Sequence, residues 1–146
     1  MANRNFNGVQ INQSATIVET AGADMDDCRN RIMAYDKDGN VILAADGSTI
    51  PVGIALIEAG INDMSGKESG KVSAGDDVDI QIKDIGYVLA GGDIAKGAEV
   101  TAGEGGLAAA AQAGDYVIGI ALSAASKDDY VRVQIAKYQK TGGSKS

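Results

Sequence analysis

Residues 39–56 read Gly39-Asn-Val-Ile-Leu-Ala-Ala-Asp-Gly-Ser-Thr-Ile-Pro-Val-Gly-Ile-Ala-Leu56, and they align without gaps on Gly105-Gly-Leu-Ala-Ala-Ala-Ala-Gln-Ala-Gly-Asp-Tyr-Val-Ile-Gly-Ile-Ala-Leu122. Seven of the eighteen positions are identical at an offset of 66 residues. In both copies Gly-Ile-Ala-Leu leads, after a turn, into an alternating segment that ends in Gln-Ile. The repeat predicts two halves that share one β-meander. Since a solenoid needs several stacked copies, we expect the halves to face each other around one small core, as a barrel or sandwich.

Alternation of apolar and polar residues is the dominant local pattern around this repeat. It is clearest in Val9-Gln10-Ile11, in Val78-Asp79-Ile80-Gln81-Ile82 and in Val131-Arg132-Val133-Gln134-Ile135. A period of two is typical of a half-buried strand, and twenty glycines against one proline indicate many tight turns. Helix is expected at most once, at 23–30, where Asp24 could cap two turns. The sequence therefore predicts an all-β protein, a small β-barrel or β-tulip-like domain built from two similar β-meander halves.

The chain divides by composition into three parts. Residues 13–137 are expected to form a single β domain, preceded by an Asn-rich N-terminal arm at 1–12 and followed by a flexible C-terminal tail at 138–146. The polar, glycine-rich stretch at 62–75 takes the place of a much shorter connection in the second copy. We expect it to be an exposed inserted loop.

Enzymatic and metal-binding functions are disfavoured by the residue types that are missing. The sequence has no histidine to act as a base near neutral pH, and its one cysteine, Cys28, cannot pair to hold zinc. The glycines at 60 and 66 are separated by five residues rather than the four of a phosphate loop, and Glu68 stands where that loop needs Ser or Thr. The sequence predicts no enzyme, no cofactor and no metal.

Charge and hydropathy bear on the class of partner. The formal net charge of −7 repels phosphate backbones, so neither nucleic acid nor an anionic membrane is an expected partner. No stretch approaches the roughly 20 apolar residues of a membrane-spanning helix, and the first residues lack the apolar region of a signal peptide. We therefore expect a protein made in a cytosol that binds other proteins.

The N-terminal arm carries the candidate binding residues. Residues 3–11 combine hydrogen-bonding asparagines with an isolated aromatic ring and a short alternating segment, which could add a strand to the edge of a partner's sheet. The candidates are Asn5, Phe6, Val9 and Ile11. The alternative is a frayed terminus followed by an ordinary edge strand.

Several segments together resemble a known family. These are Asp93-Ile-Ala-Lys-Gly-Ala-Glu-Val-Thr-Ala-Gly103, Val117-Ile-Gly-Ile-Ala-Leu-Ser-Ala-Ala125 and Val131-Arg-Val-Gln-Ile135, which the first half joins through Val52-Gly-Ile-Ala-Leu56. They look like the head decoration, or cement, proteins of tailed bacteriophages, a family often mislabelled as a phage recombinase of the RecA or RadA type. The failed phosphate loop lends no support to the recombinase label.

The resemblance implies a virion structural protein without an active site. Such a protein is commonly trimeric, sits on the outer surface of the expanded capsid and stabilises it by binding subunits of the major capsid protein, after synthesis in the cytoplasm of the bacterial host. In the family an N-terminal arm often lies on the capsid, which would give the four arm candidates their role. The alternatives are another phage structural module, from a tail or baseplate, and a small-ligand or carbohydrate-binding β module.

Overall fold

The computed structural model describes residues 16–56, 64 and 70–141, and within them the protein is all-β, as predicted. Its only helical element there is a single 3-10 turn at Glu104–Gly106. The first five strands are β1 (Thr16–Thr20), β2 (Ile32–Tyr35), β3 (Val41–Leu43), β4 (Pro51–Ala55) and β5 (Asp77–Gln81). The second five are β6 (Ile85–Leu89), β7 (Glu99–Ala102), β8 (Ala108–Ala110), β9 (Tyr116–Ala121) and β10 (Tyr130–Gln139).

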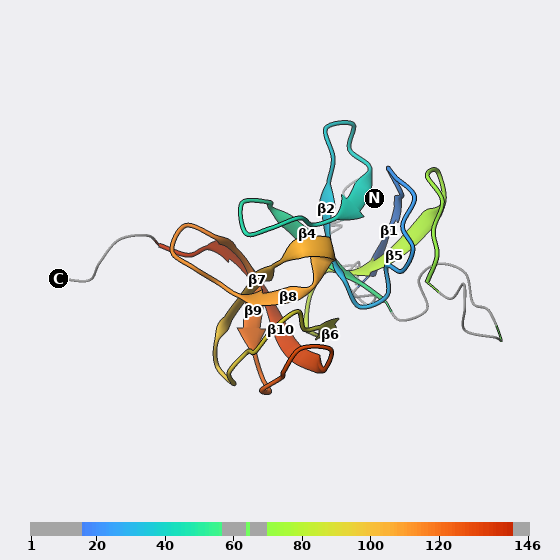
Figure 1. Ribbon diagram of the computed structural model, residues 1–146. Helices are drawn as coiled ribbons and strands as arrows, with labels where there is room; N and C mark the ends of the chain where they lie inside the picture. Colours follow the sequence, from blue (N-terminus) through green and yellow to red (C-terminus); the bar gives the residue numbers. More distant parts are fainter. Residues whose placement is uncertain (1–15, 57–63, 65–69, 142–146) are drawn as a thin grey trace, which may run out of the picture.

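These strands form two five-stranded antiparallel sheets with the same internal order. The first runs β1-β5-β4-β2-β3 and the second β6-β10-β9-β7-β8, so each strand of the first half has its counterpart five strands later. In Figure 1 the paired strands β1 and β5 lie on the right, whereas β7 to β10 lie toward the lower left. The prediction of two similar halves is confirmed, but neither half is a simple β-meander, because β1 pairs with β5, and β6 with β10, rather than with the next strand along the chain.

Each sheet curls until its edges meet. Ala21, directly after β1, forms a parallel bridge with Val41 of β3, and Ala90, directly after β6, forms the same bridge with Ala108 of β8. Because β1 and β3 are the two edges of the first sheet, and β6 and β8 those of the second, each half approaches a small closed barrel. We refer to the halves as the first and second barrel.

Two hydrophobic clusters fill the structure instead of the single core expected from the repeat. One lies wholly in the first barrel and includes Met33, Val52 and Ile80. The other holds the interior of the second barrel and also takes in four residues from the first: Ile32, Ala34, Ala44 and Ile54. The expectation of one shared core was wrong because a five-stranded barrel curls tightly enough to enclose its own Val, Ile and Ala side chains.

The repeated Gly-Ile-Ala-Leu motif has a packing cause. A Cβ atom at Gly53 would lie 2.2 Å from the carbonyl oxygen of Gln81, and one at Gly119 would lie 2.1 Å from that of Gln134. Both glycines stand next to an irregularity in strand pairing, where β4 passes β2 and β9 passes β7. Glycine is therefore needed for the close approach of neighbouring backbones, and not for chemistry.

Strand pairing also corrects the ungapped alignment of the repeat. Met33 of β2 pairs with Gly53 on one side and with Leu43 on the other. In the second barrel, Val100 of β7 pairs with Gly119 on one side and with Ala110 on the other. Leu43 and Ala110 lie 67 positions apart, whereas the glycines lie 66 apart. The alignment is one residue off at β3 and β8, because the chain from Leu43 to Gly53 is one residue longer than the chain from Ala110 to Gly119.

Three expected segments differ or lie partly outside the described residues. The possible helix at 23–30 is extended at Met25, which exchanges backbone hydrogen bonds of 2.8 and 2.9 Å with Val72. In the described part of the expected exposed loop, Lys71 and residues 73–75 are exposed, but Gly70 and Val72 are buried, and Val72 packs in the core of the first barrel. Strand β10 runs on to Gln139, into the range expected as a tail, while residues 1–15 and 142–146 are not described.

Candidate protein-binding surface

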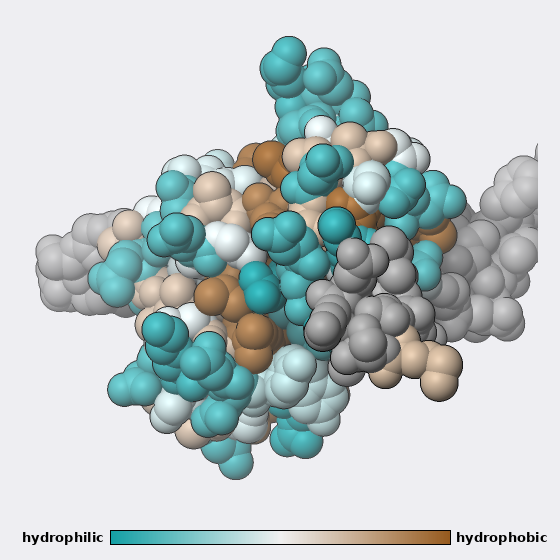
Figure 2. All heavy atoms as spheres, turned by 45° about the vertical axis from the view of Figure 1, so that its right-hand side comes forward, coloured by the Kyte–Doolittle hydropathy of each residue, from teal (hydrophilic) through white to brown (hydrophobic). Residues whose placement is uncertain are grey.

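The four residues predicted to bind a capsid, Asn5, Phe6, Val9 and Ile11, all lie outside the described residues. Their role stays a prediction. Figure 2 shows that hydrophobic residues nevertheless reach the surface near the middle of one face of the molecule, between hydrophilic loops above and below. The described part of the chain offers two such places, a sheet face and a pocket.

The described residues show neither a metal-binding cluster nor an activated cysteine. They contain no group of three or more His, Cys, Asp or Glu side chains placed to hold a metal ion. Burial, and the neighbouring charge of Asp27, raise the pKa of the Cys28 thiol to about 11, so it stays protonated and unreactive at neutral pH. No helix in this part of the chain is long and apolar enough to cross a membrane.

The first surface lies on the outer side of the β6–β10 pair, and we call it the aromatic face. Tyr87 stands directly opposite Arg132, and Leu89 opposite Tyr130, while Ile85 continues the same side of β6. The side chains of Ile85, Tyr87 and Tyr130 are 49%, 52% and 52% exposed. Tyrosine and arginine are enriched among the residues that dominate protein interfaces, since each combines a large contact area with a polar end.

The duplicated first barrel provides an internal comparison for this face. The same pairing register places Thr16, Val18 and Thr20 of β1 beside Gln81, Asp79 and Asp77 of β5. The first barrel thus has Thr16, Val18 and Thr20 where the second has Ile85, Tyr87 and Leu89, and it has two acids where the second has Arg132 and Tyr130. Since both sheets fold with the same strand order, the fold does not require the aromatic residues, and the aromatic face is a candidate binding surface.

Contacts from the first barrel hold the edge of the aromatic face in place. The side-chain amide of Asn30 donates to the Tyr87 carbonyl at 3.0 Å, and its own backbone carbonyl accepts from Leu89 N at 3.0 Å. Beside it, Arg29 makes a two-pronged contact with Asp27 at 2.9 and 2.8 Å. That contact raises the pKa of the Arg29 guanidinium, with a smaller contribution from Tyr130, so an Arg29–Asp27 ion pair lies beside the face.

Sequence reasoning missed the aromatic face, although a signal was present. Tyr130 and Arg132 occupy the outward positions of an alternating strand, where polar residues are the rule, and Tyr87 does the same in β6. A large aromatic residue at an outward position indicates a surface with a partner. What the sequence did not reveal is that Tyr87 and Tyr130, 43 positions apart, share one face.

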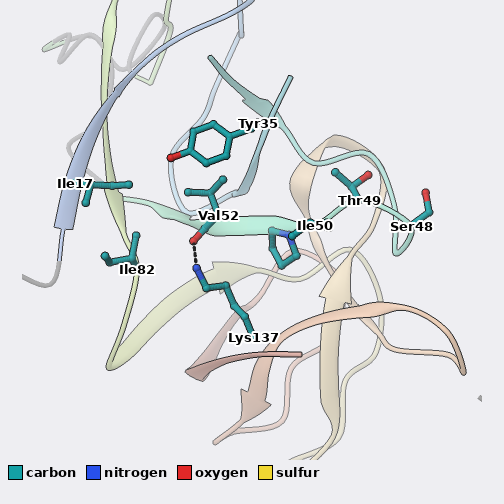
Figure 3. Close-up of a pocket in the computed structure, with 9 residues that line it drawn as sticks. Ile17, Tyr35, Ser48, Thr49, Ile50, Val52, Ile82 and Lys137 are labelled. Atoms are coloured by element: carbon teal, nitrogen blue, oxygen red, sulfur yellow. Dashed lines mark hydrogen bonds between the residues drawn. The ribbon is translucent and has the colours of Figure 1, made fainter. Parts of the chain in front are cut away.

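The second surface is a pocket of about 620 Å³ at the mouth of the first barrel, which we call the mouth pocket. Figure 3 shows Ile17 and Ile82 on one side, Tyr35 above Val52 in the middle, and Thr49 and Ser48 on the other side. The Tyr35 hydroxyl donates to the carboxylate of Glu19, which raises the pKa of Tyr35.

One cation from the second barrel reaches the floor of this pocket. Lys137 Nζ donates to the carbonyl oxygen of Val52 at 2.8 Å, as the dashed line in Figure 3 marks. Burial lowers the pKa of Lys137, because the charged amine is partly withdrawn from water. The remaining lining residues are mostly apolar, so the pocket suits an apolar segment better than a charged small molecule.

Comparison with known proteins gives one informative likeness. No protein-family model matches the chain, and no curated protein matches its sequence. Among solved structures the chain is similar to the head fiber gp8.5 N base of bacteriophage phi29, with a TM-score of 0.61 and 24% sequence identity. The match covers 83% of this chain and 92% of that chain. At this identity the likeness shows a shared fold.

Proposed function

We propose that this protein is a structural component of a phage virion that attaches to the outer surface of the head by binding the major capsid protein. The aromatic face carries the proposal, since it is an exposed set of interface-type residues that the fold does not need. The likeness to a head fiber base supports the choice of a head over a tail or baseplate. The function needs neither catalysis nor a cofactor.

Attachment by many copies suits a surface of this modest size. A head presents the same capsid protein many times, so weak single contacts add up when the bound protein is itself an oligomer. We propose a homotrimer, in which three aromatic faces engage neighbouring capsid subunits together. The arm residues Asn5, Phe6, Val9 and Ile11 remain proposed additional contacts to the capsid.

The net negative charge agrees with a position on the outside of the head. The acids at the turns of the first barrel keep a protein-coated particle soluble, and they repel free nucleic acid. The aromatic face differs from this background, since Arg132 lies on it and Arg29 borders it. A complementary capsid surface would present apolar groups with an acidic rim.

Co-sedimentation with heads that lack the protein tests the proposal. We expect saturable binding at a fixed ratio to the major capsid protein, weakened about tenfold or more by Tyr87→Asp, which amounts to about 1.4 kcal/mol. Val18→Asp is the matched control, because it places the same charge at the equivalent position of the first barrel. If the unaltered protein does not sediment with heads, the proposed function is wrong; if both variants bind like it, the aromatic face is not the contact.

A further inference from the structure

The mouth of the first barrel is open, whereas the corresponding end of the second barrel is filled by side chains. Position 17 of β1 corresponds to position 86 of β6, since Ile17 pairs with Ile80 and Gly86 with the equivalent Val133. Ile17 lines the open mouth pocket of the first barrel. At Gly86, by contrast, a Cβ atom would lie 2.9 Å from Cδ1 of Ile54, which comes from the first barrel.

The second barrel is therefore closed at its mouth by the half of the chain that precedes it. Ile32, Ala34, Ala44 and Ile54 belong to the cluster that fills the second barrel. All four are at most 1% exposed, so this mouth is as well packed as a protein interior. The structure thus shows which side chains fit such a mouth: Ile and Ala side chains from β2, from β4 and from the residue after β3.

A second copy of the chain cannot close the first barrel in the same way. The positions of the second barrel that correspond to Ile32 and Ile54 are Glu99 and Ile120, which pair with each other as those two do. Glu99 accepts a hydrogen bond of 2.6 Å from Tyr138 and lies 3.1 Å from Lys140 Nζ. Stacking another barrel there would bury a carboxylate and displace its partners, which costs free energy.

We propose that the N-terminal segment Phe6–Ile11 of the same chain docks in the mouth pocket of the free protein. The mouth of the second barrel is filled by residues that come earlier in the chain. The first barrel would then be filled in the same way, by the residues that precede it. The segment has apolar residues at alternating positions, Val9 and Ile11, with Phe6 before them. Fifteen residues precede β1, and the six steps from Ile11 to Ile17 span up to about 20 Å of extended chain, enough to turn back into the pocket.

The charges at the rim agree with this occupant. Residues 1–15 contain Arg4 and no acid, whereas Glu19 stands at the rim with its carboxylate held by Tyr35. The apolar lining would receive the Val, Ile and Phe side chains. The inference concerns the free protein and does not depend on attachment to a head, which would require the segment to leave the pocket before it could lie on a capsid.

Disulfide trapping in the full-length chain tests the docking. Ile50 lines the pocket and is 65% exposed, so Ile50→Cys can be combined with Val9→Cys or with Ile11→Cys. Oxidised glutathione would convert the two thiols to a disulfide and take up their two electrons and protons as reduced glutathione. Native Cys28 is fully buried with a raised pKa, so it stays silent.

The control uses strand alternation to hold the reach of the arm constant. Val18 follows Ile17 directly but points to the opposite side of β1, so Ile11→Cys with Val18→Cys tests a site close to the start of β1 and outside the pocket. We expect at least one pocket pair to close within one chain about tenfold faster than this control pair. Equal rates, or disulfides that join two chains, would overturn the proposal.

A chain that begins at Asn12 gives an independent measurement. In methyl NMR spectra the signals of Ile50 and Ile82, which line the pocket, should shift when the segment is removed. The signal of Ile85, on the aromatic face, should stay in place. Unchanged signals of Ile50 and Ile82 would show that the segment was never docked.

Discussion

At the scale of single residues, glycines rather than polar groups carry the repeat. Gly53 and Gly119 occupy equivalent points where a backbone carbonyl of the neighbouring strand leaves no room for a methyl group. The motif that first suggested a family is thus explained by strand packing. A repeated motif can therefore report a shared fold without reporting any shared chemistry.

Substitution at these glycines should measure the cost of that close approach. We expect Gly53→Ala and Gly119→Ala each to lower the free energy of unfolding by about 1–3 kcal/mol, because the strands must separate to admit a methyl group. Gly92→Ala is the control, since no atom lies within 4 Å of the Cβ it would gain. Urea unfolding measures all three, and equal stability of the three variants would contradict the packing explanation.

Tyr138 should report its surroundings through its titration. Burial, together with the hydrogen bond it donates to Glu99, raises its pKa to about 12 from the ordinary 10.0. The unfolded chain loses this proton first as the pH rises, so the stabilising contribution is complete below pH 10 and is lost between about 10 and 12. Absorbance of tyrosinate should show a late component that shrinks in Tyr138→Phe; an unchanged late component would rule out this assignment.

At the scale of elements, β10 does more than complete its sheet. It is ten residues long, and beyond an irregularity between Ile135 and Tyr138 it pairs with the start of β9. This extension carries Lys137 to the carbonyl of Val52 in the first barrel, and Tyr138 to Glu99. It therefore covers the part of the second barrel around Glu99.

Truncation at two points separates the extension of β10 from the residues after it. A chain ending at Thr141 should melt like the full protein, because the described contacts of β10 are kept. A chain ending at Ala136 should melt several degrees lower, since it loses the pairing of Tyr138 and Gln139 with β9 and the cover over Glu99. Calorimetry compares the two, and identical melting temperatures would show that the extension adds no stability.

At the scale of the whole molecule, two barrels with separate interiors are joined by residues of the first that pack inside the second. Ile32 and Ile54 sit on strands of the first barrel but belong to the interior of the second. The halves are therefore not independent domains in series. Loss of these shared side chains should weaken both.

Ile54→Ala tests this coupling against Ile80→Ala, which alters only the interior of the first barrel. Each change should cost about 2–5 kcal/mol, as is usual for a large buried side chain. In native-state hydrogen exchange, Ile54→Ala should lower protection in β9 and β10 directly, by opening the mouth of the second barrel. If protection falls only in β1 to β5, the two barrels fold separately.

The sequence by itself determined the all-β class, the duplication and most of the strands, because alternation and turn residues are local signals that do not depend on distant contacts. Only the tertiary structure decided that there are two cores, that Tyr87 and Tyr130 share a face, and that one mouth is closed while the other is open. The physical reason is that residues in two copies of the same strand pattern acquire different surroundings only when the first copy packs against the second. A periodic sequence predicts which side chains point inward, but it does not predict which of the two cores each side chain joins.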